Sequence, residues 1–220
     1  RVRSSAASDV YKRQLLDRLS PPAKAIGSVN TIIIRGDALT GHNTDATGFA
    51  SAFRAVLGAQ HPGCVALIGA GGVGRAIAFA LAELGAAELR ISDRDPGKAR
   101  ALARTLESRL PTRAASEARE ALAGATGLVN ATPAGMLPDR STPVPVELLH
   151  EGLWVADAVY SPLWTPLLVA ARKCGARLMT GRELCVRQAR DAFALFTGFS
   201  ADAELMGAAF DEVMRARTTG

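Results

Sequence analysis

The feature that most constrains the fold is a glycine-rich loop between an apolar segment and an Ala-rich segment. Residues 65–68 predict a buried strand, and the loop after them opens a helix; it consists of Gly69, Ala70, Gly71, Gly72, Val73 and Gly74. In such a loop the glycine at the position of Gly69 allows a tight turn, the one at Gly71 leaves room for a phosphate, and the one at Gly74 lets helix and strand pack closely. The positive end of the helix attracts a pyrophosphate. The loop therefore predicts a dinucleotide site.

Strands and helices alternate after this loop. Five further strands are predicted, at residues 89–92, 113–114, 127–130, 153–156 and 176–179. A helix is expected at 98–110. Alternating strand–helix units build a parallel sheet with helices on both faces, and a chain with only 5% aromatic residues suits that packing. We predict an α/β fold with a doubly wound, Rossmann-like parallel sheet.

A smaller α/β region precedes the sheet. Its apolar spacing and turn residues predict a helix end, a break at Ser20-Pro21-Pro22 and a short helix within 15–25. They then predict a hairpin at 29–42 and a helix at 44–57. The last two helices, at 183–197 and 201–217, are followed by no strand. We expect them to pack back on the first region. The predicted division is a first lobe at 15–58, a nucleotide-binding domain at 59–182 and returning helices at 183–220.

Composition and charge exclude several classes of protein. The net charge is +5, but basic and acidic residues are interspersed, which argues against nucleic acid as a partner. Cys64, Cys174 and Cys185 show neither a metal-ligand spacing nor a disulfide framework, so no metal is expected. No apolar run reaches the ~18 residues of a membrane span, and the N-terminus shows no signal-peptide pattern. We expect a cytoplasmic protein with no membrane partner.

Two positions after predicted strands bear on the cofactor. Asp93 lies about twenty residues beyond the glycine loop, where a carboxylate accepts hydrogen bonds from the adenosine ribose and repels a 2′-phosphate. This favours NAD, although Arg94 leaves NADP open because a guanidinium can hold that phosphate. Asn130 and Thr132 begin another loop at the carboxyl edge of the sheet, where we expect them to hold ribose or nicotinamide. An ordinary polar turn is the alternative for that loop.

The first lobe carries a second group of polar residues. Asn30 and Asp45 both lie at predicted strand ends, where they are expected to converge on a polyol if those ends face the cofactor. Hydride transfer from a secondary alcohol needs one group to take the hydroxyl proton and another to orient the alcohol. Helix capping by Asn43 or Asp45 is the alternative.

Five ordered motifs across residues 15–198 resemble those of the shikimate dehydrogenase family, including its quinate/shikimate branch. They are Gly27-Ser28-Val29-Asn30-Thr31, Asn43-Thr44-Asp45, Asn130-Ala131-Thr132-Pro133 with Gly135-Met136, Asp157-Ala158-Val159-Tyr160 with Thr165-Pro166-Leu167, and Gly181 through Gln188 to Phe193. Ser28 and Ala46 depart from the alanine and glycine usual in the family. The resemblance implies a substrate lobe beside the Rossmann-like domain. It also implies reversible hydride transfer between a nicotinamide cofactor and the carbon that is a ketone in 3-dehydroshikimate.

The resemblance further implies roles for individual residues. Asp45 would be the catalytic carboxylate, while Asn30 and Gln188 would bind substrate hydroxyls. Tyr160 would line the substrate and nicotinamide site, although packing or capping is the alternative for Tyr160 and Gln188. The cofactor residues implied are 69–74, Asp93, Arg94, Asn130, Thr132, Pro133 and Gly181. A non-catalytic dinucleotide-binding regulatory module is the competing function, and both the choice between shikimate and quinate and a homodimer are left open.

The first fourteen residues stand apart from the rest. Residues 4–14 can be encoded by the adapter that transposon-based sequencing kits attach to DNA fragments, so we interpret 1–14 as a non-native segment in place of the natural N-terminal part; an ordinary polar tail is the alternative. The resemblance implies a proton-transferring lysine near position 9, where Asp9 stands. General acid–base catalysis contributes roughly 10² to 10⁴ in rate, so we expect this chain to bind NAD with little turnover.

Overall fold

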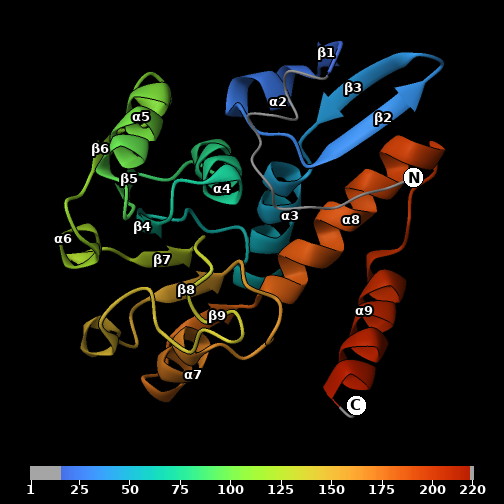
Figure 1. Cartoon of the computed structure of the whole chain (residues 1–220). Helices are drawn as coiled ribbons and strands as arrows, with labels where there is room; N and C mark the ends of the chain where they lie inside the picture. The colour runs from blue at the N-terminus through green and yellow to red at the C-terminus, as the bar shows by residue number, and fades with distance from the viewer. Residues whose placement is uncertain (1–15, 219–220) are drawn as a thin grey trace.

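The computed structural model describes residues 16–218. The chain forms a large and a small β-sheet with helices packed around them (Figure 1). The interpretation of residues 1–14 as a non-native segment lies outside the described residues. Among residues 16–218, no helix has both the length and the apolar character that crossing a bilayer requires.

The large sheet has six parallel strands in the order β6-β5-β4-β7-β8-β9. Their bounds are β4 (Cys64–Ile68), β5 (Glu88–Ser92), β6 (Thr112–Ala114), β7 (Gly127–Asn130), β8 (Trp154–Asp157) and β9 (Arg177–Met179). The chain enters at β4, moves outward to β6, and crosses back to β7 on the other side of β4. This reversal confirms the predicted doubly wound sheet. In such sheets ligands bind beyond the carboxyl ends of the strands at the reversal, which here lies between β4 and β7.

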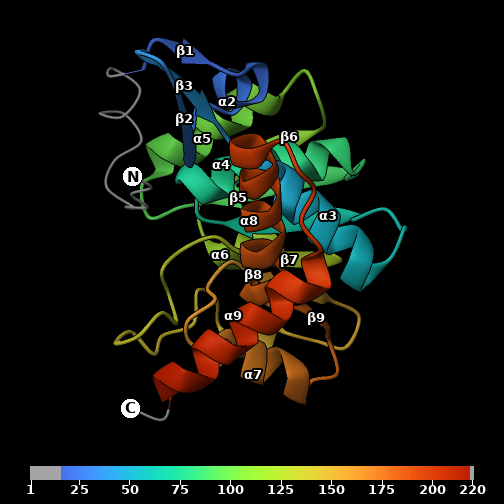
Figure 2. The same cartoon turned by 90° about the vertical axis from the view of Figure 1, so that its right-hand side faces the viewer.

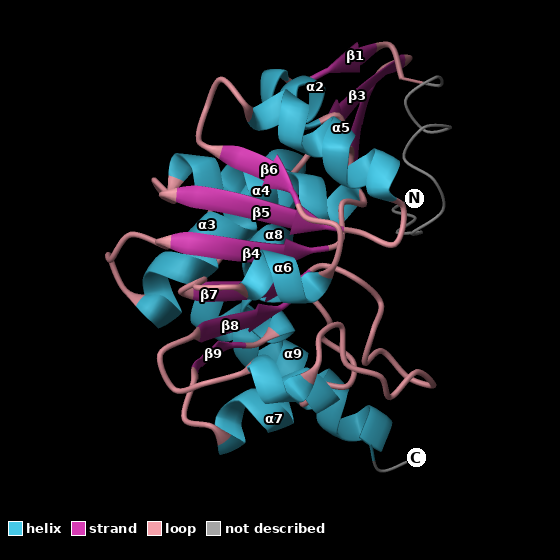
Figure 3. Cartoon of the chain, turned by 90° about the vertical axis from the view of Figure 1, so that its left-hand side faces the viewer, coloured by secondary structure: helices cyan, strands magenta, loops and turns pink. Residues whose placement is uncertain are grey.

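Alternate residues of the central strands enter two separate cores. In β4, Val65 and Leu67 face a core built with α3 (Asp45–Leu57), α4 (Gly72–Glu83) and α5 (Pro96–Leu106). Ala66 and Ile68 face the opposite core, and the elements that contribute to it are α6 (Ala118–Leu122), α7 (Pro166–Lys173) and the 3-10 turn η1 (Val146–Leu148). Helices therefore cover both faces of the sheet, which explains why the residues of its central strand β4 are apolar on both faces (Figure 3).

The small sheet differs in part from the sequence prediction. The hairpin of β2 (Thr31–Arg35) and β3 (Ala38–His42) is confirmed, but residues predicted to end a helix instead form β1 (Arg18–Leu19), parallel to β3. A two-residue strand has no detectable periodicity, so only its pairing with β3 defines it. The prolines begin α2 (Pro21–Ile26) with Ser20 as its cap, because a helix tolerates proline in its first turn.

Two helices between strands were not predicted from the sequence. The five-residue α6 is too short for a recognisable helical period. By contrast, α7 carries a clear start signal, because the Thr165 hydroxyl accepts a hydrogen bond from the Leu168 N–H and Pro166 occupies the first helical position. That signal was available in the sequence.

The two C-terminal helices pack against different parts of the molecule. α8 (Gly181–Thr197) packs along α3 and touches β2, whereas α9 (Ala203–Thr218) packs on α8 (Figure 2). The Arg182 guanidinium at the start of α8 donates to both carboxylate oxygens of Asp211, at 2.7 and 2.8 Å. α8 thus connects the small sheet to the large one, and α9 is fastened mainly to α8.

The packing of α3 on the sheet predicts a large stability effect. Phe53 is fully buried and meets Trp154 edge to face, with ring centroids 5.1 Å apart. Phe53→Ala should lower the free energy of unfolding by about 3–5 kcal/mol, because it removes apolar burial and leaves a cavity. Denaturant unfolding measures this. Phe199→Ala is the matched control, since that ring is 72% exposed and its loss should change stability by less than about 0.5 kcal/mol.

Candidate active site

Three of the four glycines in the loop after β4, Gly69, Gly71 and Gly74, occupy different environments. Gly69 has a positive φ of 106° and donates its N–H to the Ser92 carbonyl at 2.8 Å, so it makes the turn out of the strand. A Cβ atom on Gly74 would overlap the Gly69 carbonyl oxygen. A Cβ atom on Gly71 would meet nothing within 4 Å. The open side of the loop therefore lies at Gly71, at the N-terminus of α4, where a phosphate would meet the backbone.

Asp93 is held against this loop. Its carboxylate accepts hydrogen bonds from the Ala70 N–H at 2.7 Å and from the Asp95 N–H at 2.8 Å. The end of β5 is thus fastened to the start of the glycine loop, and the position agrees with a ribose-binding carboxylate. Arg94 follows on an exposed turn.

The side chain of Asn130 has a different role from the one predicted. Its side chain is fully buried at the end of β7, and all its hydrogen-bonding groups are used within the protein. The amide donates to the Ala134 carbonyl and to Asp157, while its oxygen accepts from the N–H and hydroxyl of Thr132. We therefore correct the expectation that this side chain contacts ribose or nicotinamide. Asn130 shapes the loop that contains Thr132 and Pro133.

A buried carboxylate stands next to Asn130. Asp157, the last residue of β8, is 2% exposed and accepts hydrogen bonds from Asn130, from the Val159 N–H and from the Thr165 hydroxyl, at 2.9, 3.0 and 2.6 Å. Burial raises the pKa of Asp157 to about 6, and the three hydrogen bonds oppose that rise. The sequence placed this residue within a family motif but assigned it no role.

The polar residues of the first lobe form one hydrogen-bonded cluster. The Asn30 amide donates to the Asp45 carboxylate at 2.8 Å and to the Thr44 hydroxyl at 3.0 Å. The Thr44 hydroxyl in turn donates to the Gln188 side-chain oxygen at 3.3 Å. Three segments far apart in the sequence therefore meet at the N-terminus of α3. Asn43 supplies the helix cap, because its side-chain oxygen accepts from the backbone N–H groups of residues 45 and 46.

Two close approaches bring α8 to this cluster. A Cβ atom on Gly48 would lie 2.8 Å from the Gln188 nitrogen, so glycine is needed where α3 meets α8. A Cβ atom on Gly181 would overlap the Val159 carbonyl oxygen, so α8 begins directly against the loop after β8. Tyr160 in that loop is 46% exposed and packs edge to face on Phe210 of α9. Neither Thr44 nor Gly48 was singled out as a site residue from the sequence.

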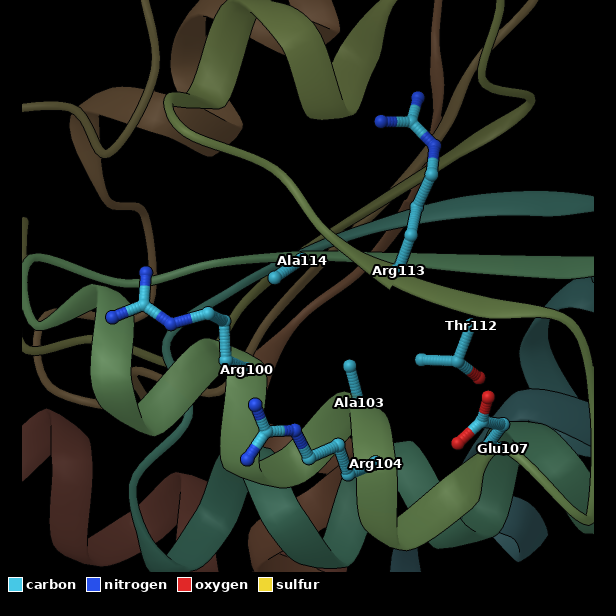
Figure 4. Close-up of a pocket in the computed structure, with 7 residues that line it drawn as sticks. All are labelled: Arg100, Ala103, Arg104, Glu107, Thr112, Arg113 and Ala114. Carbon is cyan, nitrogen blue, oxygen red and sulfur yellow. The ribbon is translucent and has the colours of Figure 1, made fainter.

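A separate hollow of about 190 Å³ lies between α5 and β6. Its lining residues are Arg100, Ala103, Arg104, Glu107, Thr112, Arg113 and Ala114, none of which was predicted as a site residue. The guanidinium group of Arg113 points in a different direction from those of Arg100 and Arg104 (Figure 4). Arg113 also pairs with Glu88 and Glu120. We therefore do not assign this hollow to the chemistry.

Known proteins resemble this chain along most of its length. The family model described as "NADP oxidoreductase coenzyme F420-dependent" matches residues 64–154, the stretch from β4 to the start of β8. A quinate/shikimate dehydrogenase (NAD(+)) of Corynebacterium efficiens is 43% identical over 202 residues, covering 89% of this chain and 71% of that protein. The chain belongs to the shikimate dehydrogenase family. A shikimate dehydrogenase (NADP(+)) of Streptomyces avermitilis is 44% identical and covers 87% of this chain and 67% of that protein.

A solved structure agrees with this family membership. The quinate dehydrogenase of Corynebacterium glutamicum in complex with NAD matches with a TM-score of 0.85 and 37% identity, over 94% of this chain and 76% of that one. The Rossmann-like fold predicted from the glycine loop is confirmed. Members of the family use NAD or NADP, as the names of these relatives state.

The glycine loop yields a prediction that separates folding from binding. Gly74→Ala should lower the melting temperature and abolish NADH binding, because the added methyl group collides with the Gly69 carbonyl. Gly71→Ala should leave the melting temperature unchanged, because its methyl group meets no protein atom, yet weaken NADH binding where the phosphate would lie. Thermal unfolding and NADH fluorescence titration measure the two effects. Equal NADH affinity for Gly71→Ala and the unaltered chain would contradict the predicted phosphate position.

The buried carboxylate predicts a pH dependence of stability. Because the folded-state pKa of Asp157 is about 6 and the ordinary value is 3.8, the folded state holds the proton more tightly. Its contribution to the free energy of unfolding should fall by up to about 3 kcal/mol as the pH rises from about 4 to above 6. The difference in unfolding free energy between the unaltered chain and Asp157→Asn, measured at each pH, isolates the contribution of Asp157. The same difference taken with Glu88→Gln should change with pH in the opposite direction and at lower pH, since hydrogen bonding and ion pairing with Arg90 lower the pKa of Glu88 to about 2.

Proposed function

We propose that this chain carries the machinery of a dehydrogenase that oxidises the secondary alcohol of shikimate or quinate with NAD and reduces the corresponding 3-dehydro ketone in reverse, with little turnover in the chain itself because Asp9 stands where the family resemblance implies a proton-transferring lysine. The observation that carries the proposal is the cluster in which Asn30 donates to both Asp45 and Thr44, and Thr44 donates to Gln188. A protein that only senses a dinucleotide needs no such polar residues beside the cofactor domain. Membership of the shikimate dehydrogenase family supports the same reaction.

The residues of the cluster suit the two tasks that alcohol oxidation requires. NAD, held at the glycine loop and Asp93, would supply the hydride acceptor for this oxidation. The Asp45 carboxylate lies at the positive N-terminus of α3, which stabilises its charge, and it takes the hydroxyl proton as the ketone forms. Asn30 and Gln188 orient the neighbouring hydroxyls of the substrate. Tyr160 closes the side of the site that adjoins the loop after β8.

The cofactor residues fit a dinucleotide. The open face at Gly71 leaves room for a pyrophosphate, and the Asp93 carboxylate is already oriented by the Ala70 N–H. A carboxylate there accepts ribose hydroxyls and repels a 2′-phosphate, so we favour NAD over NADP. The backbone of the loop shaped by Asn130 and the glycine at 181 complete the nicotinamide side. In this proposal residues 59–182 hold the cofactor, and residues 15–58 with 183–220 hold the small hydroxy acid.

Substitution at Asp45 tests the reaction. Asp45→Asn preserves an oxygen for the Asn30 amide but cannot take a proton, so NAD affinity should stay unchanged while NADH formation from shikimate or quinate falls by about 10²-fold or more. Calorimetric titration and absorbance at 340 nm under single-turnover conditions measure the two quantities. Asp37→Asn, in the exposed β2–β3 turn, is the control and should change neither.

The competing function gives a different result in the same titrations. A non-catalytic regulatory module would bind NAD but show no affinity for shikimate or quinate with NAD present. Binding of either acid, weakened by Gln188→Ala, supports the dehydrogenase. NAD binding with neither acid bound would instead favour the regulatory module.

A further inference from the structure

Asp157 lies where two loops of the cofactor domain meet. It ends β8 beside the end of β7, and its side chain is almost completely buried. Asn130 reaches it from β7, and Thr165 reaches it from the start of α7. The Val159 N–H supplies a third donor from its own loop. These three donors are uncharged, so the carboxylate is held by hydrogen bonds and not by an ion pair.

The loop after β7 depends on this carboxylate through Asn130. The Asn130 amide is shared between Asp157 and the Ala134 carbonyl, and its oxygen orients Thr132. This loop begins beside the glycine loop. The Ala131 N–H donates to the carbonyl of Ile68, the residue that precedes Gly69, at 2.7 Å. A Cβ atom on Gly69 would lie 2.7 Å from the Ala131 carbonyl oxygen. Asp157 is thus two contacts away from the predicted pyrophosphate site.

The loop after β8 depends on the same carboxylate. Val159 is fixed by its N–H on Asp157, and its carbonyl packs against Gly181, where α8 begins. α8 carries Gln188 of the substrate cluster. Tyr160 directly follows Val159. The geometry therefore places one carboxylate between the glycine loop and the helix that completes the substrate site.

Resting on the proposed function, we propose that Asp157 is a positioning residue that holds the loops after β7 and β8 in the arrangement that binds the nicotinamide cofactor, and that this hold depends on the carboxylate oxygen that accepts from Thr165. One carboxylate oxygen accepts from both Asn130 and Val159, and the other accepts from the Thr165 hydroxyl. The Thr165 hydroxyl oxygen also accepts from the Leu168 N–H, so Thr165 connects Asp157 to the start of α7.

A substitution of nearly equal shape isolates the bond from Thr165. In Asp157→Asn the amide oxygen still accepts from Asn130 and Val159, while an NH₂ group replaces the oxygen that accepts from Thr165. The Thr165 hydroxyl hydrogen then loses its acceptor, although the size of the side chain at position 157 is unchanged.

The test measures NADH affinity by fluorescence titration at pH 7.5, together with the melting temperature. Asp157→Asn should weaken NADH binding about tenfold, as expected for loss of coupling through one buried network.

Thr165 provides an independent pair of variants. Thr165→Val removes the hydroxyl that donates to Asp157 and should weaken NADH binding several-fold, whereas Thr165→Ser keeps the hydroxyl and should restore it. Thr126→Val is the matched control, because the Thr126 hydroxyl donates to the Pro62 and Cys64 carbonyls just before β7, at the amino end of the sheet. It should lower the melting temperature without changing the affinity for NADH.

The outcomes separate this inference from a purely structural role. A lower melting temperature with unchanged NADH affinity in Asp157→Asn and Thr165→Val would overturn it. If Asp157→Asn does not fold, the contrast between Thr165→Val and Thr165→Ser decides. Failure of the unaltered chain to bind NADH would refute the proposed function and this inference together, whereas loss of substrate binding alone would refute only the proposed function.

Discussion

The site depends on backbone segments that approach one another too closely for a Cβ atom. Gly74 lies on Gly69, Gly69 on Ala131, and Gly181 on Val159, all at the carboxyl edge of the large sheet. These contacts bring the three loops after β4, β7 and β8 together. The contact of Gly48 with α8 then places the substrate cluster beside them. Larger residues at these positions would push apart the segments that must share one ligand.

Three carboxylates near this edge differ because their surroundings differ. Asp93 is oriented by backbone N–H groups beside the glycine loop, which suits recognition of a ribose. Asp45 lies at a helix N-terminus and faces an amide, which suits proton transfer. Asp157 is enclosed, so its pKa is raised and it braces neighbouring loops. Differences in burial and in hydrogen-bond donors thus suit three carboxylates to three different roles.

Much of the fold could be predicted because its signals are local. The apolar strands and the glycine loop follow from residue type and spacing, and their alternation indicates the doubly wound sheet. β1 was missed because two residues carry no period, and only hydrogen bonds to β3 define it. Asn130 was misjudged for a related reason. Its place after a strand suggests a ligand contact, but its burial depends on Asp157 and Ala134, which lie elsewhere in the chain.

The sequence by itself determined the Rossmann-like sheet, the dinucleotide loop and, through ordered motifs, the family. Only the tertiary structure decided which polar residues meet. Asn30, Thr44 and Gln188 are separated by up to 158 positions, and their hydrogen bonds form because α8 packs on α3. The raised pKa of Asp157 likewise follows from enclosure by β7 and α7. Residue type and spacing encode local conformation, whereas burial and long-range contact exist only once distant segments have packed together.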